Sequence, residues 1–193
     1  MVRFSDMKGK FFVIVGPSAS GKTELVKALI SKIPNSARLV TKTTRPRRPE
    51  EKETDYFFIS REEFEKGIAE GDFFEYAEVY GNLYGSSKKV LDDFRSKYDY
   101  VFAIIDVQGA QTLKEKMPDA HFIFIRPGSI EDIKKRLLRV RRSISTDELQ
   151  KRLENIAHEL SLAETFETVI ENPDGRFSEA VQKAMEVVKK SGS

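Results

Sequence analysis

The segment from residue 16 to residue 23 fits the pattern G-x-x-x-x-G-K-[ST] at every fixed position. An apolar run at residues 11–15 precedes it, and a helical pattern of apolar residues follows it. This setting matters because the short pattern also arises by chance, whereas a phosphate-binding loop needs a strand before it and a helix N-terminus after it. The expected loop consists of Gly16, Pro17, Ser18, Ala19, Ser20, Gly21, Lys22 and Thr23.

Each fixed position of this pattern has a chemical task. Successive backbone N–H groups surround the β-phosphate, Lys22 reaches the β and γ oxygens, and the Thr23 hydroxyl can bind Mg²⁺. The alternative, a glycine-rich turn with an unrelated lysine, is disfavoured by the strand and helix patterns on its two sides. We therefore expect a bound nucleoside triphosphate, with Mg²⁺ as its companion ion.

The composition excludes several other kinds of site. The 193 residues are 39% hydrophobic and 33% charged, and the net charge is only +2, so charge alone indicates neither nucleic acid nor a membrane as a partner. There is no cysteine, which excludes disulfides, thiolate metal sites and cysteine catalysis. No apolar run approaches the roughly 18 residues of a membrane span. The expected location is the cytoplasm.

Apolar runs of strand length alternate with helical periodicity along the chain. Several of the runs are continuously apolar, which is typical of parallel strands covered on both faces. This alternation predicts an α/β fold with a parallel sheet. The expected strands lie at residues 11–15, 38–41, 100–106, 121–125 and 168–170, with a first helix at 23–32.

Two segments interrupt the alternation. Residues 38–87 hold a polar, proline-containing loop, short strand patterns and one short helix, which together predict an inserted small mixed β lobe. Residues 139–150 are basic at first and lie between helical patterns, which predicts a lid. We expect one domain over residues 1–193, with its core at about 1–37, 88–138 and 151–190.

The loop at residues 43–49 places Arg45 and Arg48 three positions apart between prolines that restrict the backbone. Guanidinium groups held in this way can grip a phosphate by paired hydrogen bonds. Taken alone, the loop equally fits a solvated basic surface or a nucleic-acid patch.

The order of motifs resembles the guanylate kinase family of P-loop nucleoside monophosphate kinases, over about residues 10–188. The motifs that carry the resemblance are Thr43-Thr44-Arg45-Pro46, Asp55-Tyr56-Phe57-Phe58, Gly81-Asn82-Leu83-Tyr84-Gly85 and Ile105-Asp106-Val107-Gln108-Gly109-Ala110. The resemblance implies a P-loop kinase fold with an α/β/α core, a GMP-binding lobe at 38–87 and a helical lid. It also implies that the GMP phosphate binds Arg45, Arg48, Tyr56 and Tyr84, and that the base meets Thr41, Glu75 and Ser86.

The chemistry of guanine agrees with this assignment. Its N1–H and N2–H groups are adjacent donors and O6 is an acceptor, so the Glu75 carboxylate can accept both while a hydroxyl of Ser86 or Thr41 donates to O6. Adenine has the opposite polarity at that edge. The alternative for Glu75 is an ordinary carboxylate on an edge strand.

Asp106 follows an apolar strand at its carboxyl end, where ligands gather in open α/β sheets. The resemblance implies that Asp106 helps to organise Mg²⁺, and a helix N-cap is the alternative role. The family commonly has an acidic residue two positions earlier, and here that position is Ile104.

A second basic concentration lies towards the C-terminal end of the chain. Such charges on a helix are usually solvated. The resemblance nevertheless implies that some of them close over the transferring phosphoryl group, namely Arg136, Arg152 and one of Arg141 or Arg142. We expect Arg139 to be an ordinary surface residue.

The expected reaction is ATP + GMP → ADP + GDP, with dGMP as a further acceptor. Two alternatives stay open at this stage. One is a kinase of the same fold with a different phosphorylated acceptor, and the other is a guanylate-kinase-like module that binds a protein without catalysis.

Overall fold

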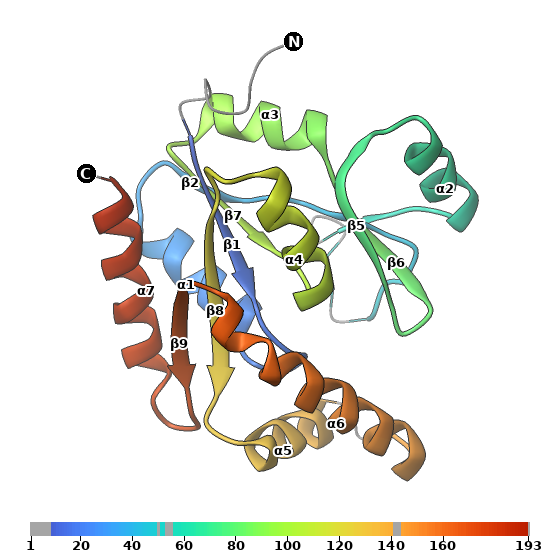
Figure 1. The fold of residues 1–193 in the computed structure, drawn as a ribbon, viewed down its shortest axis with the longest axis vertical. Coiled ribbons are helices and arrows are strands. Elements are labelled where there is room, and N and C mark those ends of the chain that lie inside the picture. The colour runs from blue at the N-terminus through green and yellow to red at the C-terminus, as the bar shows by residue number, and fades with distance from the viewer. Residues whose placement is uncertain (1–8, 50, 53–55, 141–143, 193) are drawn as a thin grey trace. The chain divides into compact units, whose positions relative to one another are not determined.

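The computed structural model describes residues 9–49, 51–52, 56–140 and 144–192 (Figure 1). The chain divides into two compact units. The first contains the described residues within 1–12, 35–103 and 108–121, and the second contains those within 13–34, 104–107 and 122–193. The elements in chain order are β1 (Lys10–Val15), α1 (Lys22–Lys32), β2 (Ser36–Arg38), β3 (Lys42–Thr43), β4 (Phe57–Phe58), α2 (Arg61–Ala69), β5 (Phe73–Val79), β6 (Asn82–Ser87), α3 (Lys88–Lys97), β7 (Tyr100–Ile104), α4 (Val107–Lys116), β8 (His121–Pro127), α5 (Ile130–Val140), α6 (Thr146–Ser161), the 3₁₀ helix η2 (Ala163–Thr165), β9 (Thr168–Asn172) and α7 (Phe177–Gly192).

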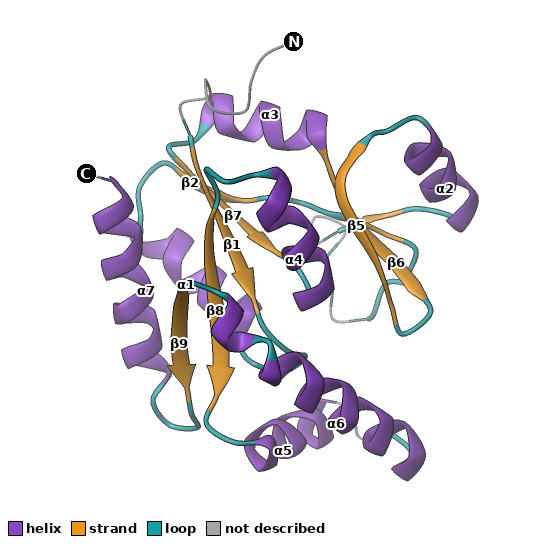
Figure 2. Cartoon of the chain, viewed as in Figure 1, coloured by secondary structure: helices purple, strands orange, loops and turns teal. Residues whose placement is uncertain are grey.

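Five strands form a sheet in the order β2-β7-β1-β8-β9 (Figure 2). Strand β2 pairs with β7 in parallel, and β8 pairs with β9 in parallel. The side chains of residues 11–15 in β1 are completely buried, as the continuous apolar run predicts. Helix α7 packs against β9 and against α1 within the second unit. The predicted α/β fold with a parallel sheet is confirmed.

The predicted strand at residues 38–41 is wrong in its position. The first sheet ends near Leu39, whose N–H donates to Phe102 O at 2.8 Å. The chain then enters a second sheet at β3, and the carbonyl oxygen of Thr41 accepts a bond from Phe57 N at 2.9 Å. A single apolar pattern therefore covers the end of one strand and the approach to another.

The second sheet lies in the first unit and has the order β4-β3-β6-β5. It is mixed, because β3 pairs with β4 in parallel and with β6 antiparallel. Its apolar core contains Phe64 of α2 stacked on Phe73 of β5, with ring centroids 4.4 Å apart, and Leu83 of β6. The predicted small mixed β lobe is confirmed.

Helices α5 and α6 of the second unit pack on each other through a small cluster. Ile133 and Leu137 of α5 meet Ile156 of α6, and Ala19 of the phosphate-binding loop packs against the same cluster. Ser145 caps α6 by accepting a bond from Glu148 N. Among the described residues, no helix combines the length and the apolar character needed to cross a membrane.

Candidate active site

The loop between β1 and α1 has the backbone that the sequence pattern predicts. Gly16 and Gly21 have φ values of 141° and 98°, which side chains other than hydrogen rarely allow. A Cβ at Gly16 would lie 2.5 Å from Ile125 O, and one at Gly21 would lie 2.4 Å from Asn172 Nδ2. Asn172 Nδ2 in turn donates to Ser20 O at 2.7 Å. The two glycines therefore permit both the turn and its packing.

Gly21→Ala should destabilise the protein more than Gly71→Ala. Gly71 also has a positive φ, 71°, but a Cβ there meets nothing within 4 Å, so alanine costs only the backbone strain, about 1 kcal/mol. At Gly21 the Asn172 amide must also give up its buried hydrogen bond, a further loss of about 1–3 kcal/mol. Urea unfolding of both variants measures the difference, and equal losses would contradict it.

Lys22 rests on its own loop in this structure. Its Nζ donates to Gly16 O at 2.5 Å and to Pro17 O at 2.7 Å. Burial lowers the pKa of Lys22 to about 8, against the opposing charges of Glu159 and Asp106. The amine can leave these carbonyls when phosphate oxygens offer it a stronger, charged acceptor.

Glu159 of α6 is an acidic neighbour that the sequence analysis did not identify. Its Oε2 atom is buried and has no hydrogen-bond partner among the described residues. Burial raises the pKa of Glu159 to about 7, although the Lys22 charge lowers it. The sequence gives no sign that Glu159 is buried near Lys22, because a glutamate on an amphipathic helix is usually solvated.

The pKa of Glu159 predicts a pH dependence of stability. Its value in the folded protein, about 7, exceeds its ordinary value of 4.5. The folded state therefore holds this proton more tightly, and its stabilising effect, complete below pH 4.5, is lost as pH rises towards 7. Glu159→Gln should flatten this part of the profile of unfolding temperature against pH.

Nucleotide-free protein in a metal chelator is the sample for this measurement. Glu167→Gln, at an exposed position, is the matched control and should keep the wild-type profile. An unchanged slope between pH 4.5 and 7 in Glu159→Gln would contradict the assignment.

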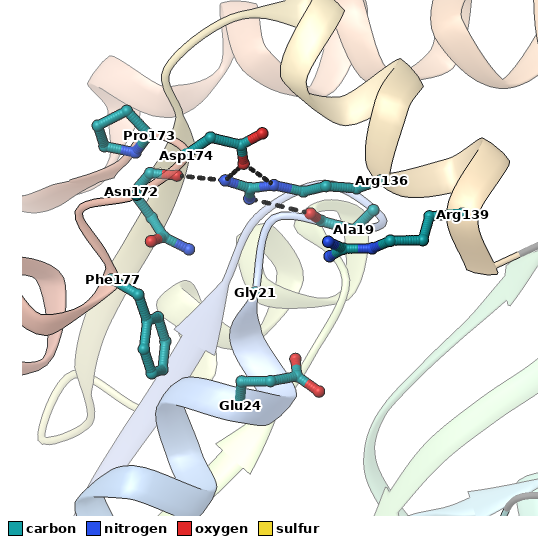
Figure 3. A pocket seen from close by; sticks show the side chains of 10 residues that line it. Ala19, Gly21, Glu24, Arg136, Arg139, Asn172, Pro173, Asp174 and Phe177 are labelled. Carbon is teal, nitrogen blue, oxygen red and sulfur yellow. Dashed lines mark hydrogen bonds and ion pairs between the residues drawn. The ribbon is translucent and has the colours of Figure 1, made fainter.

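A cavity of about 590 Å³ lies beside the loop in the second unit (Figure 3). Arg136 of α5 crosses it and donates to Asp174 Oδ1 at 2.7 Å through Nε, to Asn172 O at 2.9 Å through Nη2 and to Ala19 O at 3.3 Å through Nη1. Arg136 thus joins the phosphate-binding loop to the loop after β9. The lining residues are Ala19, Gly21, Glu24, Arg136, Arg139, Asn172, Pro173, Asp174, Gly175 and Phe177.

Residues 172–175 and 177 of this cavity were not predicted from the sequence. Asn172 ends β9 and the others come after it, so all lie at the carboxyl end of a parallel strand. That position is the signal that could have identified them. Arg139 is exposed, as predicted, but it also lines the cavity.

Of the other three arginines that the resemblance assigns to the phosphoryl group, the structure describes only Arg152. Arg152 is buried on α6, where its Nε and Nη2 donate to Glu148 Oε1 at 2.9 and 2.7 Å. Its guanidinium is therefore held by an ion pair within its own helix. Arg141 and Arg142 lie outside the described residues.

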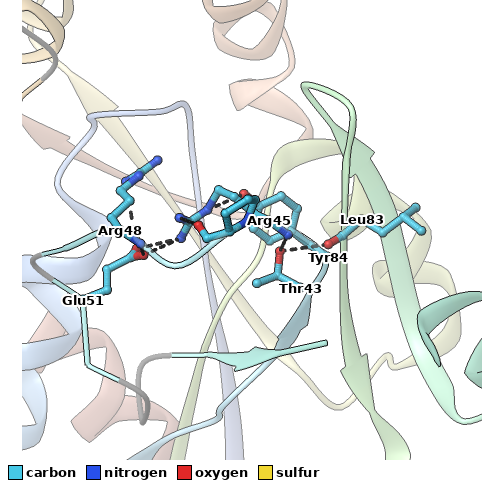
Figure 4. Close-up of polar contacts among 7 residues, drawn as sticks. Thr43, Arg45, Arg48, Glu51, Leu83 and Tyr84 are labelled. Carbon is cyan, nitrogen blue, oxygen red and sulfur yellow. Dashed lines mark hydrogen bonds and ion pairs between the residues drawn. The ribbon is translucent and has the colours of Figure 1, made fainter. Parts of the chain in front are cut away.

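In the first unit, the structure brings together Arg45, Tyr56 and Tyr84. Figure 4 shows Arg45 beside Tyr84. Arg45 Nε donates to the Tyr84 hydroxyl oxygen at 3.1 Å, and its guanidinium lies 5.6 Å from the centroid of the Tyr56 ring. Arg48 follows in the same loop, and its backbone N–H donates to Glu51 Oε2 at 2.9 Å. Arg45 also binds Glu51, which the sequence analysis did not name.

The same lobe brings Glu75 and Ser86 opposite each other. They are direct partners in the antiparallel pairing of β5 with β6, so their side chains lie on the same face. Both residues are buried, and Ser86 Oγ has no hydrogen-bond partner among the described residues. Thr41 is buried one residue before β3, which pairs with β6 through Lys42 and Gly85.

Asp106 lies in the second unit, two residues after the end of β7 and directly before α4. Its charge raises the pKa of Lys22, which places it within electrostatic range of the loop. Among the described residues there is no group of three His, Cys, Asp or Glu side chains that could hold a metal by itself.

Comparison with known proteins identifies the family. The guanylate kinase family model matches residues 8–191. The guanylate kinase of Thermotoga maritima is 38% identical over 184 residues, which cover 95% of this chain and 87% of that protein. The crystal structure of guanylate kinase from Anaplasma phagocytophilum matches with a TM-score of 0.75 at 31% identity, over 97% of this chain and 88% of that one.

A more distant match supports the fold alone. Shikimate kinase from Acinetobacter baumannii, in complex with shikimate, matches with a TM-score of 0.55 at 15% identity, over 96% of each chain. The family model and the relative at 38% identity both extend over nearly the whole length. The chain belongs to the guanylate kinase family.

Proposed function

We propose that this protein transfers the γ-phosphoryl group of ATP to GMP, forming ADP and GDP, and that Glu75 and Ser86 select the base. The observation that carries the proposal is the buried cross-strand pair of these residues, with the Ser86 hydroxyl lacking a partner among the described residues. Buried polar groups nearly always find a partner. Guanine supplies two N–H donors for the carboxylate and an O6 acceptor for the hydroxyl, and Thr41 adds a second hydroxyl.

The acceptor phosphate is assigned to Arg45, Arg48, Tyr56 and Tyr84. Two guanidinium groups and two hydroxyls match a phosphate that carries several acceptor oxygens. A phosphate monoester has a second pKa of about 6, so the attacking oxygen is already largely ionised at neutral pH. The reaction therefore needs no strong general base, and alignment with charge stabilisation is the main task of the protein.

The donor is assigned to residues 16–23, where backbone N–H groups receive its phosphates. Lys22 moves from the carbonyls of Gly16 and Pro17 to the β and γ oxygens, where its charge counts in the transition state. The cavity beside Arg136 adjoins the phosphate-binding loop, and its volume of about 590 Å³ is large enough for the adenine ring. The further positive charge comes from Arg136, from Arg152 and from one of Arg141 or Arg142.

Mg²⁺ is the ion expected with the triphosphate, and the residues present fit it. The Thr23 hydroxyl and the Asp106 carboxylate are oxygen ligands, which Mg²⁺ prefers. A site with few protein ligands also suits this ion, because Mg²⁺ keeps several waters and binds substrate phosphates. When bound, the ion neutralises charge on the phosphate oxygens.

We place the reaction in the cytoplasm, where both nucleotides occur.

A panel of acceptors tests the proposal. ATP consumption is measured with GMP, dGMP, AMP, UMP and a phosphorylated sugar at equal concentrations. We expect turnover with GMP and dGMP, and rates at least about 10³-fold lower with AMP and UMP, because polar groups left unpaired by the wrong base are costly. If only another acceptor gives turnover, that acceptor replaces GMP as the proposed substrate. Failure to bind Mg-ATP in calorimetry would favour a non-catalytic binding module.

A further inference from the structure

We infer that Glu51 is a positioning residue of the acceptor-phosphate site, because its carboxylate fixes the Arg45 guanidinium and, through it, the Tyr84 hydroxyl. The inference rests on the proposed function, since it assigns Glu51 a part in binding the GMP phosphate. Glu51 touches no substrate in this proposal and acts mainly through Arg45.

The contacts of Glu51 join two parts of the loop (Figure 4). Arg45 Nη2 donates to Oε1 at 2.7 Å and to Oε2 at 2.9 Å, and Arg48 N donates to the same Oε2 at 2.9 Å. The Glu51 backbone N–H donates back to Arg48 O at 3.1 Å. Only 12% of the Arg45 side chain and 14% of the Glu51 side chain is exposed. The carboxylate therefore closes a short turn and binds the guanidinium where little solvent reaches either group.

The other edges of the Arg45 guanidinium are also occupied. Nη1 donates to Pro46 O at 2.8 Å, and Nε donates to the Tyr84 hydroxyl oxygen at 3.1 Å. The rings of Tyr56 and Phe58 lie 5.6 and 5.8 Å from the guanidinium carbon. Because the Tyr84 oxygen accepts from Arg45, its own proton is directed away from Arg45 and is available to a ligand. Fixing Arg45 thus also orients Tyr84.

The charge of Glu51 works against phosphate binding, so its benefit must come from position. Burial raises the pKa of Glu51, but hydrogen bonds from Arg45 and Arg48 outweigh it and hold the pKa below its ordinary value. The ionised carboxylate cancels part of the Arg45 charge and repels a phosphate. Arg48 is less constrained, with its Nη1 4.0 Å from Glu51 Oε1 and 39% of its side chain exposed. Pre-organisation of Arg45 and Tyr84 offsets this repulsion.

This conflict between charge and position predicts a reversal of sign. In the wild-type background, Glu51→Ala releases Arg45 and should weaken GMP binding about tenfold or more. In an Arg45→Ala background the Arg45 guanidinium is gone. Glu51 then keeps its contacts with Arg48, but its main effect on GMP is that of an anion beside the phosphate. There, Glu51→Ala should leave GMP affinity unchanged or improve it.

Calorimetry with GMP and with guanosine on the four proteins of this cycle is the test. Guanosine lacks the phosphate, so Glu51→Ala should leave its affinity unchanged, which also shows that the lobe is folded. Glu51→Gln is the second variant, since it keeps the size of the side chain but turns a donor towards Arg45. Glu62→Ala, at an exposed position on α2, is the matched control.

The outcomes separate Glu51 from the proposed function. Equal losses of GMP affinity in both backgrounds, a matching loss for guanosine, or tighter GMP binding by Glu51→Ala in the wild-type background would each overturn the positioning role. Unchanged GMP affinity in that variant would also overturn it, while leaving the function intact. If the wild-type protein binds no GMP, the proposed function itself fails and the role of Glu51 fails with it.

Discussion

Lys22→Ala should lower kcat by about 10²–10³-fold, as expected when one charged group that stabilises the transition state is removed. In the structure, the amine donates to Gly16 O and Pro17 O, and in the proposed reaction it exchanges these carbonyls for phosphate oxygens. ATP affinity should fall much less, because the backbone N–H groups of the loop remain in place. Steady-state rates with Mg-ATP and GMP measure the first effect, and calorimetry with Mg-ATP measures the second.

Stability provides an independent check on the same variant. Burial lowers the pKa of Lys22 to about 8, which means that the folded protein holds this charge less readily than water does. Removing this charge offsets part of the loss of its two hydrogen bonds, so Lys22→Ala should unfold at a temperature close to that of the wild type. Lys27→Ala, at an exposed position on α1, is the control and should keep full turnover. A Lys22→Ala enzyme with wild-type kcat would remove Lys22 from catalysis.

Glu75→Gln should lower kcat/KM for GMP by about 10²–10³-fold. The ratio of kcat/KM for GMP to kcat/KM for AMP should fall by a still larger factor, because the variant also accepts AMP better. The amide keeps one acceptor but places an NH₂ group against a guanine N–H, so two donors face each other. The same amide is complementary to adenine, which offers an acceptor beside a donor. Rates with GMP and AMP at several concentrations give the ratio directly.

A neighbouring carboxylate on the same strand provides the matched control. Glu78→Gln changes the charge of β5 equally, but Glu78 is exposed and pairs with Arg61 at 3.3 Å. Its GMP preference should equal that of the wild type. Wild-type guanine preference in Glu75→Gln would remove Glu75 from base recognition, and an equal loss in both variants would attribute the effect to charge alone.

The features predicted from sequence are those that a local pattern determines. The loop at residues 16–23 was predictable because Gly16 and Gly21 adopt backbone conformations that few other residues allow. The lobe was recognisable from its interrupted alternation, and its site residues came from the resemblance to a family. The pairing of Glu75 with Ser86 depends on the register of two strands, which no local sequence pattern contains.

The features that were missed depend on contacts between distant segments. Glu51 and Glu159 look like solvated glutamates in sequence, and only burial beside Arg45 and near Lys22 distinguishes them. The strand expected at 38–41 was misplaced because the chain changes sheets between Leu39 and Lys42. Such tertiary effects override local propensity.

A crystal structure with Mg-ADP and GMP is the most direct test of the central claim, that this chain binds a nucleotide donor at residues 16–23 and GMP in its β lobe. We predict that the guanine N1 and N2 atoms lie about 3 Å from the Glu75 carboxylate oxygens. The GMP phosphate oxygens should lie at the same distance from the Arg45 guanidinium nitrogens and the Tyr84 hydroxyl oxygen. The ADP β-phosphate should lie against the backbone N–H groups of residues 16–23. Guanine bound elsewhere, with Glu75 and Ser86 making no contact to it, would contradict the account.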